Sequence, residues 1–340
     1  MSHRILFRVE GGGSVGFGHL VRSIAIASRI RDSRPGAEIT FISNDNRALA
    51  GKAAQAGIPV VAIPDGTDEI GFLQNFLARN PAGLLFIDTN KEYGRRQIED
   101  LEKFTRVFLF NVLSEGAFES SATVIPSAHA DSKILELFGN LNNFHAGPEW
   151  IVPGQKALEL AQKDIGIKRG TVGITTGASD PKNVMTRLLG MMQDERLANF
   201  TITGYTGEDF MHRGELDEFM KANEYENIKT EPFDMEALAA SEVVIATFGV
   251  STYELLHLGK AVISVGHAPK NAAGSKFLAD KYGAIIDLGL ADELDKERLT
   301  GSLTGIMDDK ERIAQLGNIG RELVDGKGAD RVAGLILEKI

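Results

Sequence analysis

A histidine closes a glycine-rich stretch near the start of the chain, in the sequence EGGGSVGFGHLVRS at residues 10–23. Glycines at this density expose backbone N–H groups, as loops that bind phosphate do. We expect a helix to begin near His19, which places the imidazole in the first turn, where the helix dipole disfavours the charged form of the ring. A neutral ring in that place can accept a proton, so His19 is a candidate general base.

Arg22 lies three residues after His19 and on the same face of the expected helix. Its guanidinium is a candidate to hold an anionic group of a substrate. The alternative is that His19 only caps the helix and that Arg22 is an ordinary solvated side chain. The glycine loop in front of the histidine favours the functional interpretation.

Two nucleotide-binding templates can be compared with this loop. Gly11, Gly13 and Gly16 match the G-x-G-x-x-G pattern of dinucleotide sites, and Asp45 is a candidate for the acidic residue after the second strand. Dinucleotide binding therefore stays an alternative. The Walker pattern is excluded, because a His-Leu pair stands where Lys and Ser or Thr are required.

Two further glycine turns follow expected strands in the second half. In GITTGASDPKNV, residues 173–184, Asp180 or Ser179 can cap a helix and Pro181 suits its first turn. In VVIATFGVSTYELLHLGKAVISV, residues 243–265, Ser251 and Glu254 fit a capping box. The functional alternative is that the N–H groups of residues 249–252 bind a diphosphate at the start of the helix.

The elements that position these residues follow from the apolar pattern. In the first half we expect strands at residues 5–9, 38–42, 59–62, 84–88 and 106–111, and helices at 19–30, 47–56, 69–79 and 94–103. In the second half we expect strands at residues 171–175, 199–203, 228–231, 243–246, 261–265 and 284–286. Parallel strands need crossover helices, so the predicted fold class is α/β with two doubly wound Rossmann-like domains.

The alternation breaks at residues 137–157, whose Gly, Pro and Asn content predicts a linker. We therefore expect an N-terminal Rossmann-like domain at residues 1–150, with the glycine loop and the histidine. A C-terminal domain at residues 151–340 is expected to bind the nucleotide-sugar, and its last helix can cross back. The two domains are expected to face a cleft, with ligands beyond the carboxyl ends of the strands.

Composition narrows the classes of function. The 340 residues carry a net charge of -10 with both signs scattered, which argues against a nucleic-acid partner. The absence of cysteine excludes disulfides and thiolate metal sites, and no histidine motif with metal spacing occurs, so no metal and no cofactor are predicted. No apolar run approaches a membrane span and no signal peptide is evident, so we expect a cytoplasmic protein without stable membrane insertion.

The motifs resemble a known family. Residues 16–27, GFGHLVRSIAIA, look like the opening of the pseudaminic acid pathway UDP-sugar hydrolase and its spore coat polysaccharide relatives, within the B-type glycosyltransferase (GT-B) fold superfamily. Residues 177–183, GASDPKN, resemble the family signature Gly-Gly-x-Asp-Pro-x-Asn in the corresponding place, and GPEW at residues 147–150 adds to the match. The resemblance implies the GT-B architecture and the release of a sugar from UDP.

The resemblance also implies roles for single residues. The family's Gly-x-Gly-His histidine is implicated as the base that activates water, which assigns that role to His19. Asp88 orients His19 or binds the sugar, with capping of the next helix as the alternative. Glu254 corresponds to the glutamate that holds the ribose, and Phe233 stacks on the base or is a core residue. The substrate-binding residues implied are Gly16, Gly18, Arg22, Gly177, Ser179, Asp180, Asn183, Phe233, Gly249, Val250, Ser251, Thr252 and Glu254.

The middle of the first half departs from the family. Relatives carry Asp followed by His or another ring residue after the fourth strand, where this chain has Asp88, Thr89 and Asn90. Relatives often carry acidic residues after the fifth strand, where this chain has Asn111 and Val112. These departures concern the part of the chain that would face the sugar.

We therefore predict an enzyme that hydrolyses a UDP-sugar, of the UDP-diacetamido-trideoxyhexose type, in surface polysaccharide or nonulosonic acid biosynthesis. The alternative is a GT-B glycosyltransferase that uses the same donor site. A third hypothesis is a noncatalytic protein that binds nucleotide-sugars. The expected partner is a UDP-sugar or UDP in each case.

Overall fold

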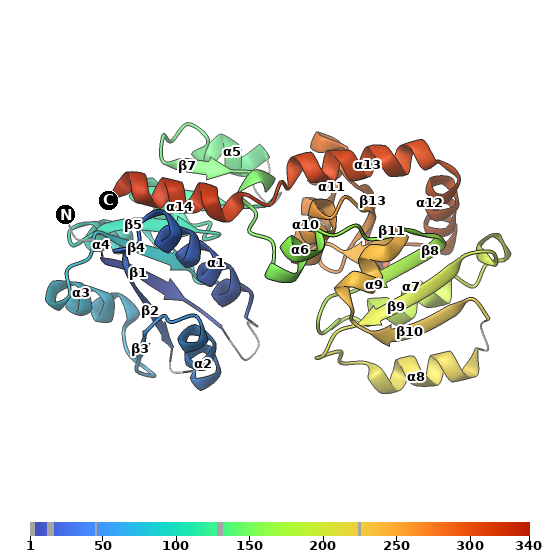
Figure 1. Ribbon diagram of the computed structural model, residues 1–340, viewed down its shortest axis with the longest axis horizontal. Coiled ribbons are helices and arrows are strands. Elements are labelled where there is room, and N and C mark those ends of the chain that lie inside the picture. Colours follow the sequence, from blue (N-terminus) through green and yellow to red (C-terminus); the bar gives the residue numbers. More distant parts are fainter. Residues whose placement is uncertain (1–3, 12–16, 45, 128–131, 224–225) are drawn as a thin grey trace. The chain divides into compact units, whose positions relative to one another are not determined.

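A computed structural model describes residues 4–11, 17–44, 46–127, 132–223 and 226–340 (Figure 1). The chain forms two compact units. Unit 1 comprises Met1–Val152 and Gly326–Ile340, and unit 2 comprises Pro153–Asp325. Each unit is built on one parallel sheet with helices on both faces, so the predicted α/β fold class with two doubly wound domains is confirmed.

The sheet of unit 1 has seven strands in the order β3-β2-β1-β4-β5-β6-β7. The strands are β1 (Arg4–Val9), β2 (Glu38–Asn44), β3 (Val60–Ile63), β4 (Leu84–Asp88), β5 (Arg106–Phe110), β6 (Ala122–Ile125) and β7 (Phe144–Ala146). The chain order reverses between β1 and β4, where Val9 lies beside Asp88 in the register. Ligands of open α/β sheets bind at such switch points, beyond the carboxyl ends of the strands.

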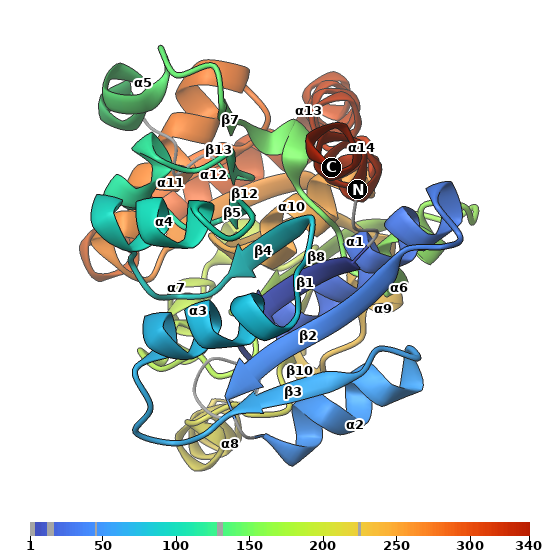
Figure 2. The same ribbon diagram turned by 90° about the vertical axis from the view of Figure 1, so that its left-hand side faces the viewer.

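Helices cover both faces of this sheet (Figure 2). They are α1 (Gly18–Ser33), α2 (Arg47–Gln55), α3 (Glu69–Arg79), α4 (Arg95–Glu102), α5 (Ser132–Phe138) and α14 (Gly328–Lys339). Leu6, Ile42 and Leu85 form a buried cluster with α3 and α4 on one face. Ile5, Phe7 and other residues of the opposite face pack with α1, α2 and α14. The last helix of the chain is therefore part of the core of unit 1.

The sheet of unit 2 has six strands in the order β10-β9-β8-β11-β12-β13, with the switch point between β8 and β11. The strands are β8 (Lys168–Thr175), β9 (Thr201–Thr206), β10 (Ile228–Pro232), β11 (Ser241–Thr247), β12 (Ala261–Gly266) and β13 (Ile286–Leu290). The helices are α6 (Gln155–Leu160), α7 (Val184–Met191), α8 (Arg213–Ala222), α9 (Met235–Ala240), α10 (Val250–His257), α11 (Pro269–Tyr282), α12 (Lys296–Asp308) and α13 (Lys310–Leu323).

Two expectations about the elements need correction. The segment expected to be a linker, residues 137–157, does contain the boundary between the units, after Val152, but it also contains β7, which pairs with β6 and forms an edge of the unit 1 sheet. Its three residues are too few to produce a pattern in the sequence. Pro181 is not in the first turn of a helix, because α7 begins at Val184.

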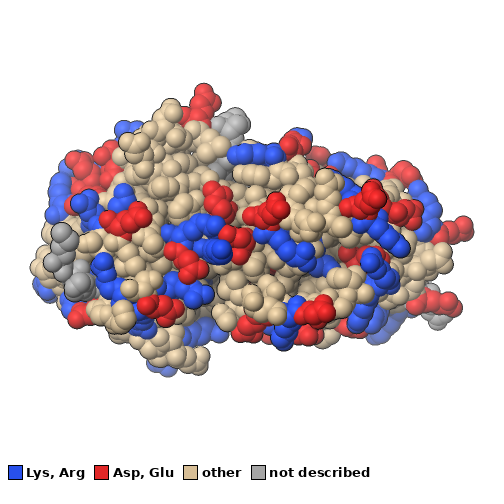
Figure 3. All heavy atoms as spheres, turned by 45° about the horizontal axis from the view of Figure 1, so that its top comes forward, with Lys and Arg blue, Asp and Glu red and all other residues tan. Residues whose placement is uncertain are grey.

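The surface carries both signs of charge. On the face drawn in Figure 3, lysine and arginine side chains are interspersed with aspartate and glutamate side chains, with areas of other residues between them. This face offers no extended basic surface for a nucleic-acid backbone. None of the helices in the described ranges combines the length and apolar character that a membrane span needs.

We predict that Ile336→Ala in α14 lowers the free energy of unfolding of unit 1 by about 3 kcal/mol, because a fully buried side chain is replaced by a cavity. Trp150, the single tryptophan, packs against the same cluster, so its fluorescence during urea denaturation reports on this unit. The control is Leu137→Ala, which removes a side chain that is 64% exposed. Equal urea midpoints for the two variants would show that α14 does not stabilise the unit.

Candidate functional site

His19 is the second residue of α1, and its ring lies at the carboxyl end of β4. The helix begins at Gly18, within one residue of the predicted start. The side chain of His19 is 8% exposed, so the ring is fixed by the protein around it and not by solvent. Gly16, another residue predicted to bind substrate, lies outside the described residues, as does Asp45 of the dinucleotide alternative.

Asp88, the last residue of β4, is fully buried and holds the imidazole. Its Oδ1 lies 2.7 Å from Nδ1 of His19, and its Oδ2 accepts from Nε of Arg22 at 2.6 Å. Burial by itself raises the pKa of Asp88, but the charge and hydrogen bonds of Arg22, together with His19, outweigh it and hold this pKa below its usual value. Asp88 is therefore a carboxylate that only accepts hydrogen bonds.

This geometry decides between two interpretations of Asp88. The carboxylate does not cap the next helix, because the residue before α4 is Gly94 and the carboxylate binds His19 and Arg22 instead. The capping interpretation is therefore wrong. The anion that Arg22 holds is Asp88, where the sequence suggested a group of the substrate.

Because Asp88 only accepts, we assign the proton of the neutral imidazole to Nδ1, which leaves a lone pair on Nε2. Nη2 of Arg22 lies 2.7 Å from Nδ1 and shares Oδ1 of Asp88 with it. On the other side of the ring, Nε2 faces Oδ1 of Asn90 at 3.1 Å. A histidine oriented in this way by a carboxylate can take a proton from water or from a hydroxyl group.

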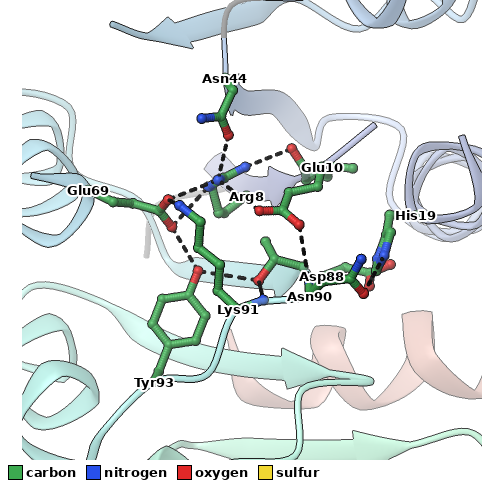
Figure 4. A network of polar contacts seen from close by, with 11 residues as sticks. Arg8, Glu10, His19, Asn44, Glu69, Asp88, Asn90, Lys91 and Tyr93 are labelled. Carbon is green, nitrogen blue, oxygen red and sulfur yellow. Dashed lines mark hydrogen bonds and ion pairs between the residues drawn. The ribbon is translucent and has the colours of Figure 1, made fainter. Parts of the chain in front are cut away.

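A second group of charges lies beside this pair, around the fully buried guanidinium of Arg8 in β1 (Figure 4). Arg8 donates to both carboxylate oxygens of Glu69, the first residue of α3, at 3.0 and 2.9 Å. It also donates to the carbonyl oxygen of Val9 and to Oδ1 of Asn44, each at 2.8 Å. Protein groups thus satisfy this arginine, which makes it a structural cation.

Glu69 also binds the loop between β4 and α4. Lys91 Nζ lies 2.5 Å from Oε2 of Glu69, and the Tyr93 hydroxyl donates to Oε1 at 2.7 Å. Burial raises the pKa of Glu69, but Arg8, Lys91 and Tyr93 outweigh it and lower this pKa to about 2. Burial and the charge of Glu69 raise the pKa of Tyr93, so its hydroxyl remains a donor. No pattern in the sequence indicates this group, which we call the Arg8 cluster (Arg8, Asn44, Glu69, Lys91 and Tyr93).

Unit 2 contains a pocket of about 600 Å³ beyond the carboxyl ends of its strands. Ligand pockets of this volume hold molecules of the size of a nucleotide. Four of the predicted residues line it, namely Gly177, Phe233, Ser251 and Glu254. Phe233 is 40% exposed, so the alternative that it is a core residue is wrong.

Glu254 does not take part in a capping box. The residue that caps α10 is Gly249, so Ser251 lies inside the first turn, and Glu254 Oε1 accepts from the backbone N–H of Gly154 at 3.0 Å. A Cβ atom at position 154 would lie 2.6 Å from this oxygen, so any other residue there would make the carboxylate shift. Burial raises the pKa of Glu254, and the N–H of Gly154 opposes the shift only in part.

The N–H groups at the start of α10 are partly used by the protein itself. Gly249 donates to Oγ1 of Thr252, and the N–H of Thr252 donates to the carbonyl oxygen of Gly249. Of the amides expected to bind a diphosphate, those of Val250 and Ser251 lie in the first turn, where a helix provides no partner for them. Val250 is 59% exposed, so this end of α10 is accessible.

The loop that contains Asp180 and Pro181 stabilises the start of α7. Asp180 is buried and accepts from the N–H groups of Val184 and Met185 at 2.9 and 2.8 Å, which satisfies the start of α7. Ser179 accepts from the N–H of Met211 through its carbonyl oxygen. Neither Ser179 nor Asp180 lines the pocket, nor does Asn183, whose amide donates to Glu215.

Several pocket residues were not predicted. Lys156 comes from α6, and Thr206, Gly207, Glu208, Asp209 and Arg213 come from the end of β9 and the segment after it. For Thr206 and the residues that follow it, the position at the end of a strand is a signal in the sequence that could have indicated them, whereas Lys156 lies in a helix and has no such signal. Among the described residues, no group of three or more histidine, aspartate or glutamate side chains is placed to hold a metal ion.

Comparison with known proteins gives distant relatives of nearly full length. No protein-family model matches the chain. The chain is 23% identical over 332 residues to the spore coat polysaccharide biosynthesis protein SpsG of Bacillus subtilis, covering 96% of both chains. It is 22% identical over 372 residues to the UDP-N-acetylglucosamine–N-acetylmuramyl-(pentapeptide) pyrophosphoryl-undecaprenol N-acetylglucosamine transferase of Parabacteroides distasonis, covering 98% of this chain and 97% of the other.

The solved structures with this two-sheet architecture include glycosyltransferases and epimerases of the GT-B fold. One of them is HepE of Anabaena, solved in complex with UDP and glucose. Its TM-score is 0.61 at 15% sequence identity, and the match covers 99% of this chain and all of the other. The fold of this chain is therefore the GT-B fold.

The Arg8 cluster gives a prediction about pH. Because the pKa of Glu69 in the folded protein is about 2, below its value of about 4.5 in the unfolded chain, its contribution to stability is complete above about pH 5 and is lost as the pH falls towards 2. Glu69→Gln should lower the unfolding free energy at pH 7 by about 2 kcal/mol and flatten this decline. Urea denaturation followed by Trp150 fluorescence, with Glu99→Gln in α4 as an exposed control, measures both effects. A Glu69→Gln profile parallel to that of the wild type would contradict the prediction.

Proposed function

We propose that the protein is a hydrolase of nucleotide-sugars that acts on a UDP-sugar. The observation that carries the proposal is the contact between His19 and Asp88. It fixes a buried imidazole whose Nε2 points away from Asp88, at the switch point of a GT-B sheet. The relatives support the substrate class, since one is named as a transferase that uses UDP-N-acetylglucosamine and HepE was solved with UDP.

In this proposal, the pocket of unit 2 binds the nucleotide. Phe233, exposed in the pocket, stacks on the base, and Glu254 accepts hydrogen bonds from the ribose hydroxyls. The amides of Val250 and Ser251, at the positive end of the α10 dipole, bind the diphosphate. The same positive end stabilises the charge that develops on the diphosphate as it leaves.

Unit 1 contributes the base. Nε2 of His19 takes a proton from water, and the water oxygen forms a bond to the anomeric carbon. The bond between the anomeric carbon and the diphosphate oxygen breaks, and UDP leaves with the electron pair. Asp88 accepts from Nδ1 throughout and stabilises the imidazolium that forms.

The biological context rests on the resemblance of the motifs to the pseudaminic acid pathway hydrolase and on the similarity to a spore coat polysaccharide protein. Together they favour a sugar of the UDP-diacetamido-trideoxyhexose type, in surface polysaccharide or nonulosonic acid biosynthesis. A second candidate is a glycosyltransferase, favoured by the near full-length similarity to the N-acetylglucosamine transferase. In that reaction His19 would deprotonate a hydroxyl of the acceptor sugar instead of water.

We predict that the purified protein, incubated with a panel of UDP- and CMP-sugars in oxygen-18 water without an acceptor, releases the nucleotide and places the label on the sugar. His19→Ala should lower the rate by about 100-fold or more, the usual contribution of a general base. Mass spectrometry of the sugar and chromatography of the nucleotide measure the two products.

The control for this experiment is His212→Ala, which removes a histidine of unit 2 that pairs with Glu215. It should keep the wild-type rate. Release of nucleotide only after a sugar acceptor is added would contradict the hydrolase and support the transferase. Binding of UDP without release under any condition would contradict both.

We predict that Glu254→Gln weakens the binding of UDP by about tenfold, because a carboxylate accepts stronger hydrogen bonds from the ribose than an amide does. The glutamine oxygen can still accept from Gly154, so the fold of the pocket is retained. Isothermal titration calorimetry with UDP measures the affinity. The matched control is Glu218→Gln on α8, an exposed residue that does not line the pocket, and equal affinity of the two variants would contradict the role of Glu254.

A further inference from the structure

Asn90 faces the nitrogen of His19 that the proposed reaction uses. Its Oδ1 lies 3.1 Å from Nε2, while Asp88 holds Nδ1 on the other side of the ring. Asn90 is an exposed residue in the loop between β4 and α4, so burial alone does not explain its position. The mechanism proposed above requires His19 and Asp88 and assigns no part to this asparagine.

The backbone that carries Asn90 is fixed at several points (Figure 4). Its own N–H donates to Oε2 of Glu10 at 2.9 Å. The next residue, Lys91, donates from its backbone to Oγ1 of Thr89 and from its side chain to Glu69. Tyr93, also bound to Glu69, holds the end of the loop. The Arg8 cluster thus fixes the loop that presents Asn90 to the ring.

The chemistry of a carboxamide suits both states of a base. When the ring is neutral, Nε2 has a lone pair and needs a donor, which the Nδ2 group of asparagine provides. When Nε2 has taken a proton, it needs an acceptor, which Oδ1 provides. Rotation of the terminal amide by half a turn exchanges the two, because this torsion is roughly two-fold. A carboxylate satisfies only the protonated ring, and an alkyl group satisfies neither state.

We propose that Asn90 is a positioning residue for His19, which holds the ring by one hydrogen bond to Nε2 before proton uptake and by another after it. This inference rests on the proposed role of His19 as the base. The orientation drawn, with Oδ1 towards Nε2, suits the protonated ring, and the opposite orientation suits the neutral one. Water or a sugar hydroxyl displaces the carboxamide from the lone pair when the proton is transferred.

The charged groups around the imidazole of His19 determine how a substitution of Asn90 changes the protonation of the ring. Asp88 lies on β4, Arg22 lies on α1 itself, and Glu10, at the end of β1, binds the backbone of Asn90. Asn90→Asp adds a carboxylate of nearly the same shape next to Nε2. This carboxylate favours the protonated ring, which cannot act as a base.

The test compares wild type, Asn90→Asp, Asn90→Leu and a control, Asn75→Asp, which adds a carboxylate to the exposed face of α3. The first readout is the pH dependence of kcat/KM for the UDP-sugar that is released fastest in the oxygen-18 assay. Asn90→Asp should move the acidic limb of this profile upwards by about one pH unit. Asn90→Leu should lower kcat about tenfold with little change in KM, because the ring loses its second point of attachment.

The second readout needs no substrate. Nitrogen-15 NMR of histidine-labelled protein reports the protons on each ring nitrogen, and His19→Ala identifies the His19 signals. In Asn90→Asp the ring should keep both protons up to a higher pH than in wild type or Asn75→Asp. Identical signals and pH profiles in Asn90→Asp and Asn75→Asp would overturn the proposal.

The two readouts separate this inference from the proposed function. If wild type hydrolyses no nucleotide-sugar while the NMR signals of Asn90→Asp differ as expected, the contact holds and the hydrolase fails. If Asn90→Leu does not fold, as judged by circular dichroism, the nearly isosteric Asn90→Asp decides the question alone.

Discussion

The candidate site depends on one constraint, which is that a carboxylate without access to water must be surrounded by donors and cations. Asp88 is fully buried at the end of β4, and His19 and Arg22, one turn apart on α1, meet that need. The constraint therefore determines how the imidazole of His19 is oriented. It also determines that Nδ1 carries the proton of the neutral ring. The switch point of the sheet brings the end of β4 and the start of α1 together, so the fold supplies the pair with its position.

The Arg8 cluster meets the same constraint on the neighbouring strand β1, where a buried cation is surrounded by acceptors. Arg8 is buried in β1 and is satisfied by Glu69, Asn44 and a backbone carbonyl. Glu10 joins the two groups, because its Oε1 lies 3.6 Å from Nη2 of Arg8 while its Oε2 accepts from Asn90. Breaking a buried ion pair costs more free energy than breaking an exposed one. The buried pair of Arg8 and Glu69 therefore resists local opening of the loop between β4 and α4. An exposed asparagine can then be held against a buried ring.

The sequence predicts the parts of the fold that depend on local pattern. Strands such as β4 and β12 are continuous apolar runs, as expected for parallel strands buried on both faces, and their predicted bounds agree with the structure within one residue. Helix starts are less certain, since α10 begins before Ser251 and α7 begins after Pro181. Of the site, the glycine turns indicated His19 and Glu254, whereas the pairing of Arg8 with Glu69, 61 positions apart, depends on tertiary structure and leaves no local signal.

Asp88 and Glu254 show how two carboxylates of one chain come to differ. Both are shielded from water, which by itself raises the pKa of each. At Asp88 a guanidinium and an imidazole outweigh the shielding, so the charge is fully compensated within unit 1. At Glu254 a single backbone N–H opposes it, so the carboxylate has unused acceptor capacity in the pocket. A ligand with hydroxyl groups can donate the hydrogen bonds that the protein does not provide to Glu254. Asp88 already has its donors within the protein. The first carboxylate is therefore suited to orient a base and the second to bind a ligand.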